Sequence, residues 1–116
     1  MRHKKRETKL GRERDPRRAL LRSLATSFVI SGKITTTIAK AKAIKPIVEK
    51  YITVSKEKNL TTKRKLAKYF YQEKAIRKLL NELGPKYKER KGGYTRIIHL
   101  DRRLGDDAEM AILELV

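Results

Sequence analysis

The chain has 116 residues, and its 31 lysines and arginines outnumber 13 aspartates and glutamates to give a formal net charge of +18. The length suits one small domain, and the absence of cysteine excludes disulfides, thiolate metal ligands and a cysteine nucleophile. No apolar run approaches the roughly 18–20 residues of a membrane span, and no hydrophobic targeting segment follows the basic N-terminus. We therefore expect a cytoplasmic protein with no membrane partner, whose charge requires a polyanion, because uncompensated charge destabilises a compact small domain.

The N-terminal region divides into an arm and the start of a folded domain. Residues 1–14 carry almost no apolar side chains, which predicts a basic extended arm that becomes ordered on its partner. The single globular domain is predicted to span residues 15–116. Its first helix should cover residues 16–31, with Asp15 as the N-cap and Gly32 as the stop signal.

The middle of the chain predicts one strand and three helices. The β-branched residues 33–38 alternate and indicate a short strand. The helix that follows contains Pro46 on its solvent side, so we expect a kink in one helix rather than two separate helices. Apolar spacing predicts a third helix near residues 61–71 and a fourth over residues 76–83, which Gly84-Pro85 should close.

The C-terminal part predicts a basic loop over residues 86–93 and then two strands. These strands, residues 94–100 and 109–115, are joined by a short turn. The second is apolar on both faces over most of its length, which is typical of a central, covered strand. The predicted order is α-β-α-α-α-β-β, an α+β fold in which helices pack on a small mixed sheet as a two-layer α/β arrangement.

Candidate catalytic groups are few. His3 lies in the arm and His99 is expected to be a half-buried strand residue, which weakens a paired-histidine ribonuclease site. The Asp106-Asp107 pair is interpreted as turn chemistry rather than as a metal or acid–base pair. Because neither a phosphate-binding loop nor a dinucleotide fingerprint is present, we expect no enzyme, metal site, cofactor or small-molecule substrate.

The cationic residues favour recognition of RNA phosphates. Residues 33–68 hold eleven basic and two acidic residues, while the last twelve residues are acidic without a cation. Arginine grips phosphate with a planar fork, and Tyr94 is the one aromatic residue set among cations at a loop edge. Low aromatic content argues against a single-strand stacking platform, so folded RNA is the better match, although charge alone leaves duplex DNA open. The arginines selected on this ground are Arg2, Arg6, Arg12, Arg14, Arg17, Arg18, Arg90, Arg96, Arg102 and Arg103.

Five blocks of sequence resemble one known family. They are MRHKKRETKLGR at the start, RRALLRSLATSF from Arg17, ITTTIAKAKAIKPIVEKYITVSK from Ile34, GGYTRI from Gly92 and MAILELV from Met110. In this order they are similar to the bacterial large-subunit ribosomal protein seventeen family across essentially the whole chain. The resemblance implies a structural component of the large ribosomal subunit, with an α/β domain on the large-subunit ribosomal RNA and a basic arm that reaches into the RNA.

The resemblance also implies a set of RNA-binding residues. From the arm it implies Arg2, His3, Lys4, Lys5, Lys9 and Arg12; from the predicted strand and the following helix Lys33, Thr36, Lys40 and Lys42; and from the last hairpin Gly93, Tyr94 and Arg96. Arg22 on the polar side of the first helix and Lys91 of the basic loop complete the predicted set.

The partners expected from these interpretations are large-subunit ribosomal RNA and neighbouring ribosomal proteins. The acidic C-terminal edge, which comprises Asp106, Asp107, Glu109 and Glu114, is the surface expected to touch those neighbours. Two rival functions stay open at this point: a nucleoid-type DNA-binding protein, which charge alone allows, and a cationic ribonuclease.

Overall fold

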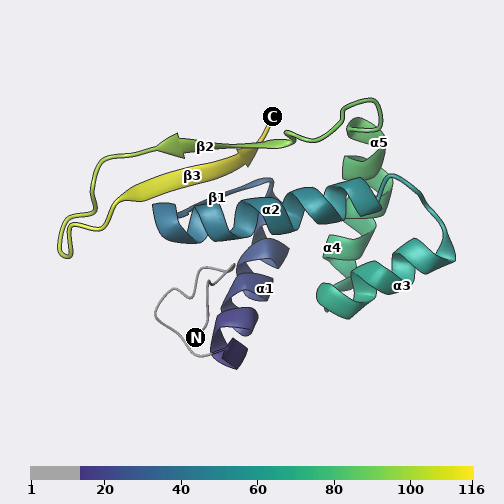
Figure 1. Ribbon diagram of the computed structural model, residues 1–116, viewed down its shortest axis with the longest axis horizontal. Helices are drawn as coiled ribbons and strands as arrows, with labels where there is room; N and C mark the ends of the chain where they lie inside the picture. The colour runs from purple at the N-terminus through teal and green to yellow at the C-terminus, as the bar shows by residue number, and fades with distance from the viewer. Residues whose placement is uncertain (1–13) are drawn as a thin grey trace, which may run out of the picture.

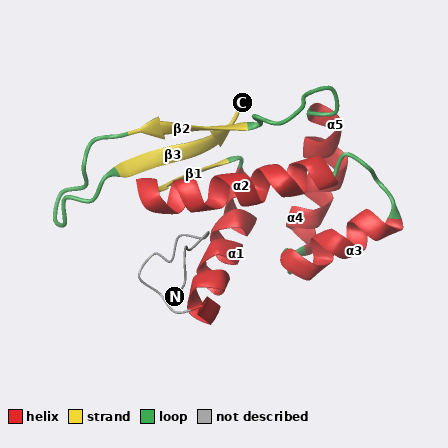
Figure 2. Ribbon diagram, in the orientation of Figure 1, coloured by secondary structure: helices red, strands yellow, loops and turns green. Residues whose placement is uncertain are grey.

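The computed structural model describes residues 14–116, so residues 1–13 of the predicted arm lie outside the described residues. Its elements confirm the predicted α+β class and the predicted order of helices and strands (Figures 1 and 2). They are α1 (Arg14–Ser31), β1 (Lys33–Thr37), α2 (Ile38–Val54), α3 (Leu60–Tyr69), α4 (Glu73–Lys78), the π-helical turn η1 (Leu79–Leu83), α5 (Gly84–Lys86), β2 (Thr95–His99) and β3 (Met110–Leu115).

The three strands form a sheet in the order β1-β3-β2. Both pairings in this sheet are antiparallel, so the expectation of a mixed sheet was wrong. Strand β3 is central, as its apolar sequence predicted, and aligns Leu113 with Ile34 on one side and Ile97 on the other. It is not covered on both faces, because α2 packs on one face only and Ile98 on the other face is 40% exposed (Figure 1).

Helix α2 forms the layer beneath the sheet, and α1 crosses α2 on the side away from the sheet (Figure 1). The core fills the space between these layers, because Phe28 of α1, Ile44 and Val48 of α2 and Leu113 of β3 are all fully buried. Pro46 lies inside a continuous α2 and is exposed, which confirms the prediction of one helix with its proline on the solvent side.

The helical run from α4 to α5 departs from the prediction at Gly84, which was expected to close the helix. Gly84 instead has helical torsions, and the chain continues through Pro85 to Lys86. A Cβ on Gly84 would clash with the carbonyl oxygen of Ser55 and would lie 3.0 Å from its carbonyl carbon. Glycine is therefore required here because the backbones approach closely, and not because the helix ends.

The start of α1 also differs from the prediction. The helix begins at Arg14, so Asp15 lies in its first turn and is not the N-cap. Asp15 there still complements the positive end of the helix dipole, and Pro16 still lies in the first turn, where its missing N–H breaks no helical hydrogen bond. Among the described residues, no helix combines the length and the apolar character needed to cross a membrane.

Candidate nucleic-acid interface

The predicted RNA-binding residues do not converge on one place. Arg18 lies on α1, Lys33 and Lys42 lie at β1 and the start of α2, Lys91 lies in the loop before β2, and Arg102 lies in the loop between β2 and β3 (Figure 1). The arm residues Arg2, His3, Lys4, Lys5, Arg6, Lys9 and Arg12 lie outside the described residues. The structure therefore separates the predicted set into several basic surfaces.

The arginines of the C-terminal hairpin are paired with carboxylates inside the molecule. Arg96 donates to Glu114 at 2.7 Å, and Arg102 donates to Glu109 at 3.0 Å. Arg103 forms a two-pronged pair with Asp106 at 2.7 and 3.0 Å. The side-chain hydrogen bond from Arg103, together with the N–H of Ala108, lowers the pKa of Asp106 to about 2. The predicted basic hairpin and the predicted acidic edge are thus one neutralised network.

Three predicted contact residues are buried, which is a correction to their assignment. Tyr94 is 1% exposed, Arg17 is 6% exposed and Thr36 is 9% exposed. The Tyr94 hydroxyl shares a 2.9 Å hydrogen bond with Thr53, and its ring lies 5.1 Å from that of Tyr87. Thr36 lies on the inner side of the alternating strand β1, whereas Tyr94 is buried from the loop that precedes β2.

Burial and hydrogen bonding act in opposite directions on the hydroxyl of Tyr94. Burial by itself raises the pKa of Tyr94, because it disfavours the phenolate. Hydrogen bonds from Lys56 and Thr53 together with the charge of Lys56 outweigh this effect, and the pKa is lowered overall. The Lys56 ammonium also lies 4.9 Å from the centre of the ring. Tyr94 therefore anchors the loop to α2.

Hydrogen bonds and a glycine with positive φ fix the conformation of the basic loop before β2. Arg90 donates from its Nε to the carbonyl oxygen of Gly93 at 3.2 Å, and its own carbonyl accepts a hydrogen bond from Lys56. Gly93 has a φ of +64°, a conformation that favours glycine. Arg90 and Lys91 are exposed on this loop, as are Lys33 and Lys42 elsewhere, whereas Lys40 is half-buried.

The structure offers no support for the paired-histidine alternative. His99 is exposed on β2 rather than half-buried as expected, and His3 lies outside the described residues. Within residues 14–116, no group of three or more histidine, cysteine, aspartate or glutamate side chains is placed to hold a metal ion. His99 thus stands on an open strand end and not in a site.

Sequence reasoning missed a basic surface on α3. This α3 basic surface comprises Lys63, Arg64, Lys65 and Lys68, all of which are exposed. None of them forms an ion pair or a side-chain hydrogen bond with any other part of the chain that the structure describes. The available signal was the segment 58–72, which holds five basic residues and no acid.

The cations of α3 oppose the stability of their own helix. Lys63 and Arg64 lie in the half of the helix where the dipole disfavours cations. Arg64 and Lys68 are like charges four residues apart, a spacing that destabilises a helix by roughly 0.2–0.5 kcal/mol. Of the four cations, only Lys68 lies in the last turn, where the dipole favours a positive charge.

Comparison with known proteins identifies the family. The family model described as Ribosomal protein L17 matches residues 20–116. The Large ribosomal subunit protein bL17 of Thermoanaerobacter sp. (strain X514) is 50% identical over 108 residues, which are 93% of this chain and 96% of that protein. The bL17 proteins of Carboxydothermus hydrogenoformans and Clostridium acetobutylicum are 48% and 49% identical over 108 residues, which are 93% of this chain and 96% and 95% of those proteins. The resemblance carried by the five sequence blocks is confirmed, and the chain belongs to the ribosomal protein L17 family.

Proposed function

We propose that this chain is a structural constituent of the large ribosomal subunit that binds folded ribosomal RNA through phosphate contacts. Membership of a ribosomal protein family makes it a structural protein and not an enzyme. The names of the bL17 relatives place those proteins in the large subunit, which supports the same assembly, cytoplasmic location and ribosomal protein neighbours for this chain.

The observation that carries the RNA contact is the α3 basic surface. Four exposed cations on a ten-residue helix without a carboxylate partner in the described structure repel one another. Each phosphate that they neutralise relieves this repulsion and releases a counterion. Exposed Arg18, Lys33, Lys42 and Lys91 extend the contact, and the arm residues are proposed to add to it.

The hairpin arginines are assigned a different role. Because Arg96, Arg102 and Arg103 already bond to carboxylates, an RNA phosphate would have to displace those partners before it gained a contact. We assign them to the geometry of the hairpin. This contrast supplies a matched experiment, since three charges can be removed from either surface.

The test compares two triple variants with the parent chain. One carries Arg64→Gln, Lys65→Gln and Lys68→Gln, and the other carries glutamine in place of the three hairpin arginines. Glutamine has nearly the helix propensity of lysine and arginine, so α3 should persist. Binding to large-subunit ribosomal RNA is measured as a function of salt concentration. Each lost phosphate contact lowers the slope of log K against log[salt] by about 0.7–0.9.

We expect the slope to fall by about two to three in the α3 variant and by less than one in the hairpin variant. Equal slopes in the α3 variant and the parent would refute the assignment of α3. Equal affinity of the parent for ribosomal RNA and for duplex DNA of matched length would favour the nucleoid-type alternative.

A further inference from the structure

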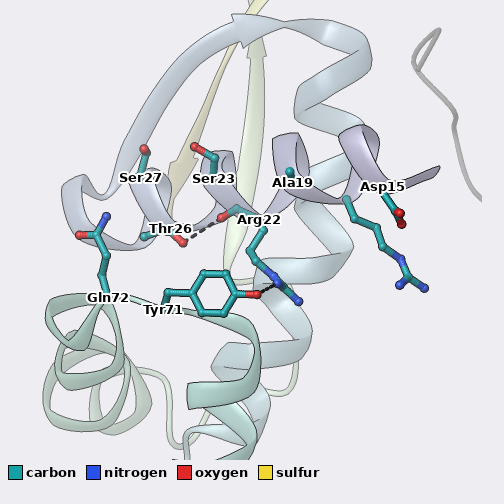
Figure 3. A pocket seen from close by; sticks show the side chains of 9 residues that line it. Asp15, Ala19, Arg22, Ser23, Thr26, Ser27, Tyr71 and Gln72 are labelled. Atoms are coloured by element: carbon teal, nitrogen blue, oxygen red, sulfur yellow. Dashed lines mark hydrogen bonds between the residues drawn. The ribbon is translucent and has the colours of Figure 1, made fainter. Parts of the chain in front are cut away.

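A groove lies between α1 and the segment that links α3 to α4 (Figure 3). Its volume is about 540 Å³, within the range of about 300–1,000 Å³ typical of small-molecule sites. Tyr71 and Gln72 line it from the linking segment, and Arg18, Arg22, Ser23 and Ser27 line it from α1. One carboxylate, Asp15, is present in the described lining, so the two arginines set its charge.

Tyr71 presents an aromatic surface in this groove. Tyr71 is 75% exposed, whereas the other tyrosines of the described structure are buried or half-buried. The guanidinium of Arg22 donates to the Tyr71 hydroxyl and its central carbon lies 4.7 Å from the centre of the ring (Figure 3). The ring is thus held by a polar contact while most of its surface stays open.

Arg22 is itself fixed by aromatic contacts but keeps unused hydrogen-bonding capacity. Its central carbon also lies 5.0 Å from the ring of Tyr69, which stacks on Tyr51 at 4.8 Å. Its Nε is buried and has no hydrogen-bond partner in the described part of the chain, so an anion in the groove would be met by the terminal nitrogens of the guanidinium. A guanidinium held in this way is preorganised, so little side-chain entropy is lost when it binds an anion.

Three further polar side chains of the groove are open to a ligand, whereas the hydroxyl of Thr26 is already used, because it donates to the carbonyl oxygen of Arg22 at 2.8 Å. The side chains of Ser23, Ser27 and Gln72 are exposed and form no hydrogen bond within the described residues. Hydroxyl and amide groups both donate and accept, which matches the mixed donor and acceptor edge of a nucleobase. The carboxylates of an acidic peptide would use the arginines but would not stack on the open ring of Tyr71.

We propose that this groove binds one unpaired nucleotide of the ribosomal RNA. The base stacks on Tyr71 and bonds to Ser23, Ser27 or Gln72, and an adjacent phosphate binds Arg18 and Arg22. The inference rests on the proposed RNA-binding function and adds a second mode to it, because α3 contacts phosphates in any helix whereas the groove selects a base that has left its stack.

The test uses the absence of tryptophan from the chain. Tyr71→Trp introduces a fluorescent ring at the groove, and Leu60→Trp, at a residue that is 61% exposed and not part of the groove, serves as the matched control. Two RNA hairpins are added, identical except that one carries a single bulged uridine. Anisotropy of labelled RNA confirms that the protein is saturated in each titration.

We expect the bulged hairpin to quench the emission of the Tyr71→Trp variant and the fully paired hairpin to leave it nearly unchanged. The Leu60→Trp variant should respond equally to both. In a second arm, Tyr71→Ala should weaken binding of the bulged hairpin about 5- to 150-fold, the range for loss of one stacked base, and leave the paired hairpin unaffected. Tyr71→Phe retains the ring and should keep the preference.

Each failure has its own signature. The groove assignment would be overturned if both hairpins quench the emission of the Tyr71→Trp variant equally. It would also be overturned if Tyr71→Ala weakens binding of both hairpins equally while the melting temperature of the protein stays that of the parent. If polyglutamate at matched ionic strength quenches the Tyr71→Trp emission as much as the bulged hairpin does, the groove would instead bind an acidic peptide. A preference for the bulge that survives the triple substitution on α3, with affinity for both hairpins unchanged, would support the groove and refute the role of α3.

Discussion

The contact between α5 and the end of α2 depends on Gly84. Replacing this glycine by alanine sets the gain in helix propensity against the steric overlap of the added Cβ with neighbouring backbone atoms. In an ordinary helix interior the substitution would stabilise the protein by about 0.8–1 kcal/mol, because glycine has more backbone freedom to lose than alanine. In this molecule the added Cβ would clash with the carbonyl oxygen of Ser55, and it would lie 3.1 Å from the carbonyl oxygen of Leu79. Both obstacles are backbone atoms, which cannot rotate away as a side chain can.

The cost of this overlap outweighs the gain in helix propensity. Overpacking in a dense core costs typically 1–3 kcal/mol and sometimes more. Because Ser55 is buried and its hydroxyl donates to the carbonyl of Ile52 at 2.8 Å, the end of α2 has little room to shift. We therefore expect Gly84→Ala to lower the free energy of unfolding by about 1–3 kcal/mol net, with a fall in melting temperature of roughly 4 °C per kcal/mol.

The assay is urea and thermal unfolding followed by far-ultraviolet circular dichroism. Asn81→Ala provides the control, because Asn81 is exposed in the same helical run and gains helix propensity without a new contact. An increase in stability of about 1 kcal/mol in the Gly84→Ala variant, similar to that of the control, would refute the close-approach argument.

Two further predictions concern the core and the hairpin. Phe28→Ala should lower the free energy of unfolding by about 3–5 kcal/mol, because Phe28 is fully buried. Leu24→Ala, at a half-buried position, should lower it by roughly 1–2 kcal/mol. Equal losses in urea unfolding would contradict the assignment of Phe28 to the buried face of α1 and Leu24 to its margin. The Asp106 carboxyl should titrate near its pKa of about 2, so its stabilising effect on the hairpin is present above the ordinary value of 3.8 and is lost as the pH falls towards 2. Arg103→Gln should return the midpoint towards 3.8 in a carbon-13 NMR titration, and an unmoved midpoint would exclude the ion pair as the cause.

The pairing of the hairpin charges shows why net charge along the sequence is a poor guide to the charge of a surface. Arg102 and Asp107 are five residues apart, and Arg96 and Glu114 are eighteen apart, yet each pair meets across the hairpin. Antiparallel pairing places Arg96 opposite Glu114 in register. The basic run and the acidic edge therefore cancel locally, and the excess of +18 is carried by the helices, the loops and the arm.

The sequence by itself determined the class of the fold, the order of its elements and the family. Helix and strand periods depend on local spacing, which is why α1 and β3 were predicted within a few residues and Pro46 was placed on the solvent side of its helix. Asp15 was misassigned because aspartate is favoured both at the N-cap and in the first turn of a helix, and Gly84 because glycine serves both as a helix stop and where two backbones approach closely. Only the structure shows which function such a residue serves.

Tertiary structure alone decided which of the predicted site residues can meet a partner. Burial removed Tyr94, Thr36 and Arg17 from the surface, and ion pairs engaged the hairpin arginines, because both effects depend on neighbours that are distant in sequence. The same packing left the α3 cations without a carboxylate in the described structure and brought Tyr71 beside Arg22, 49 residues away. Composition predicted an anionic partner, and the fold determines which of the described cations keep their charge unpaired.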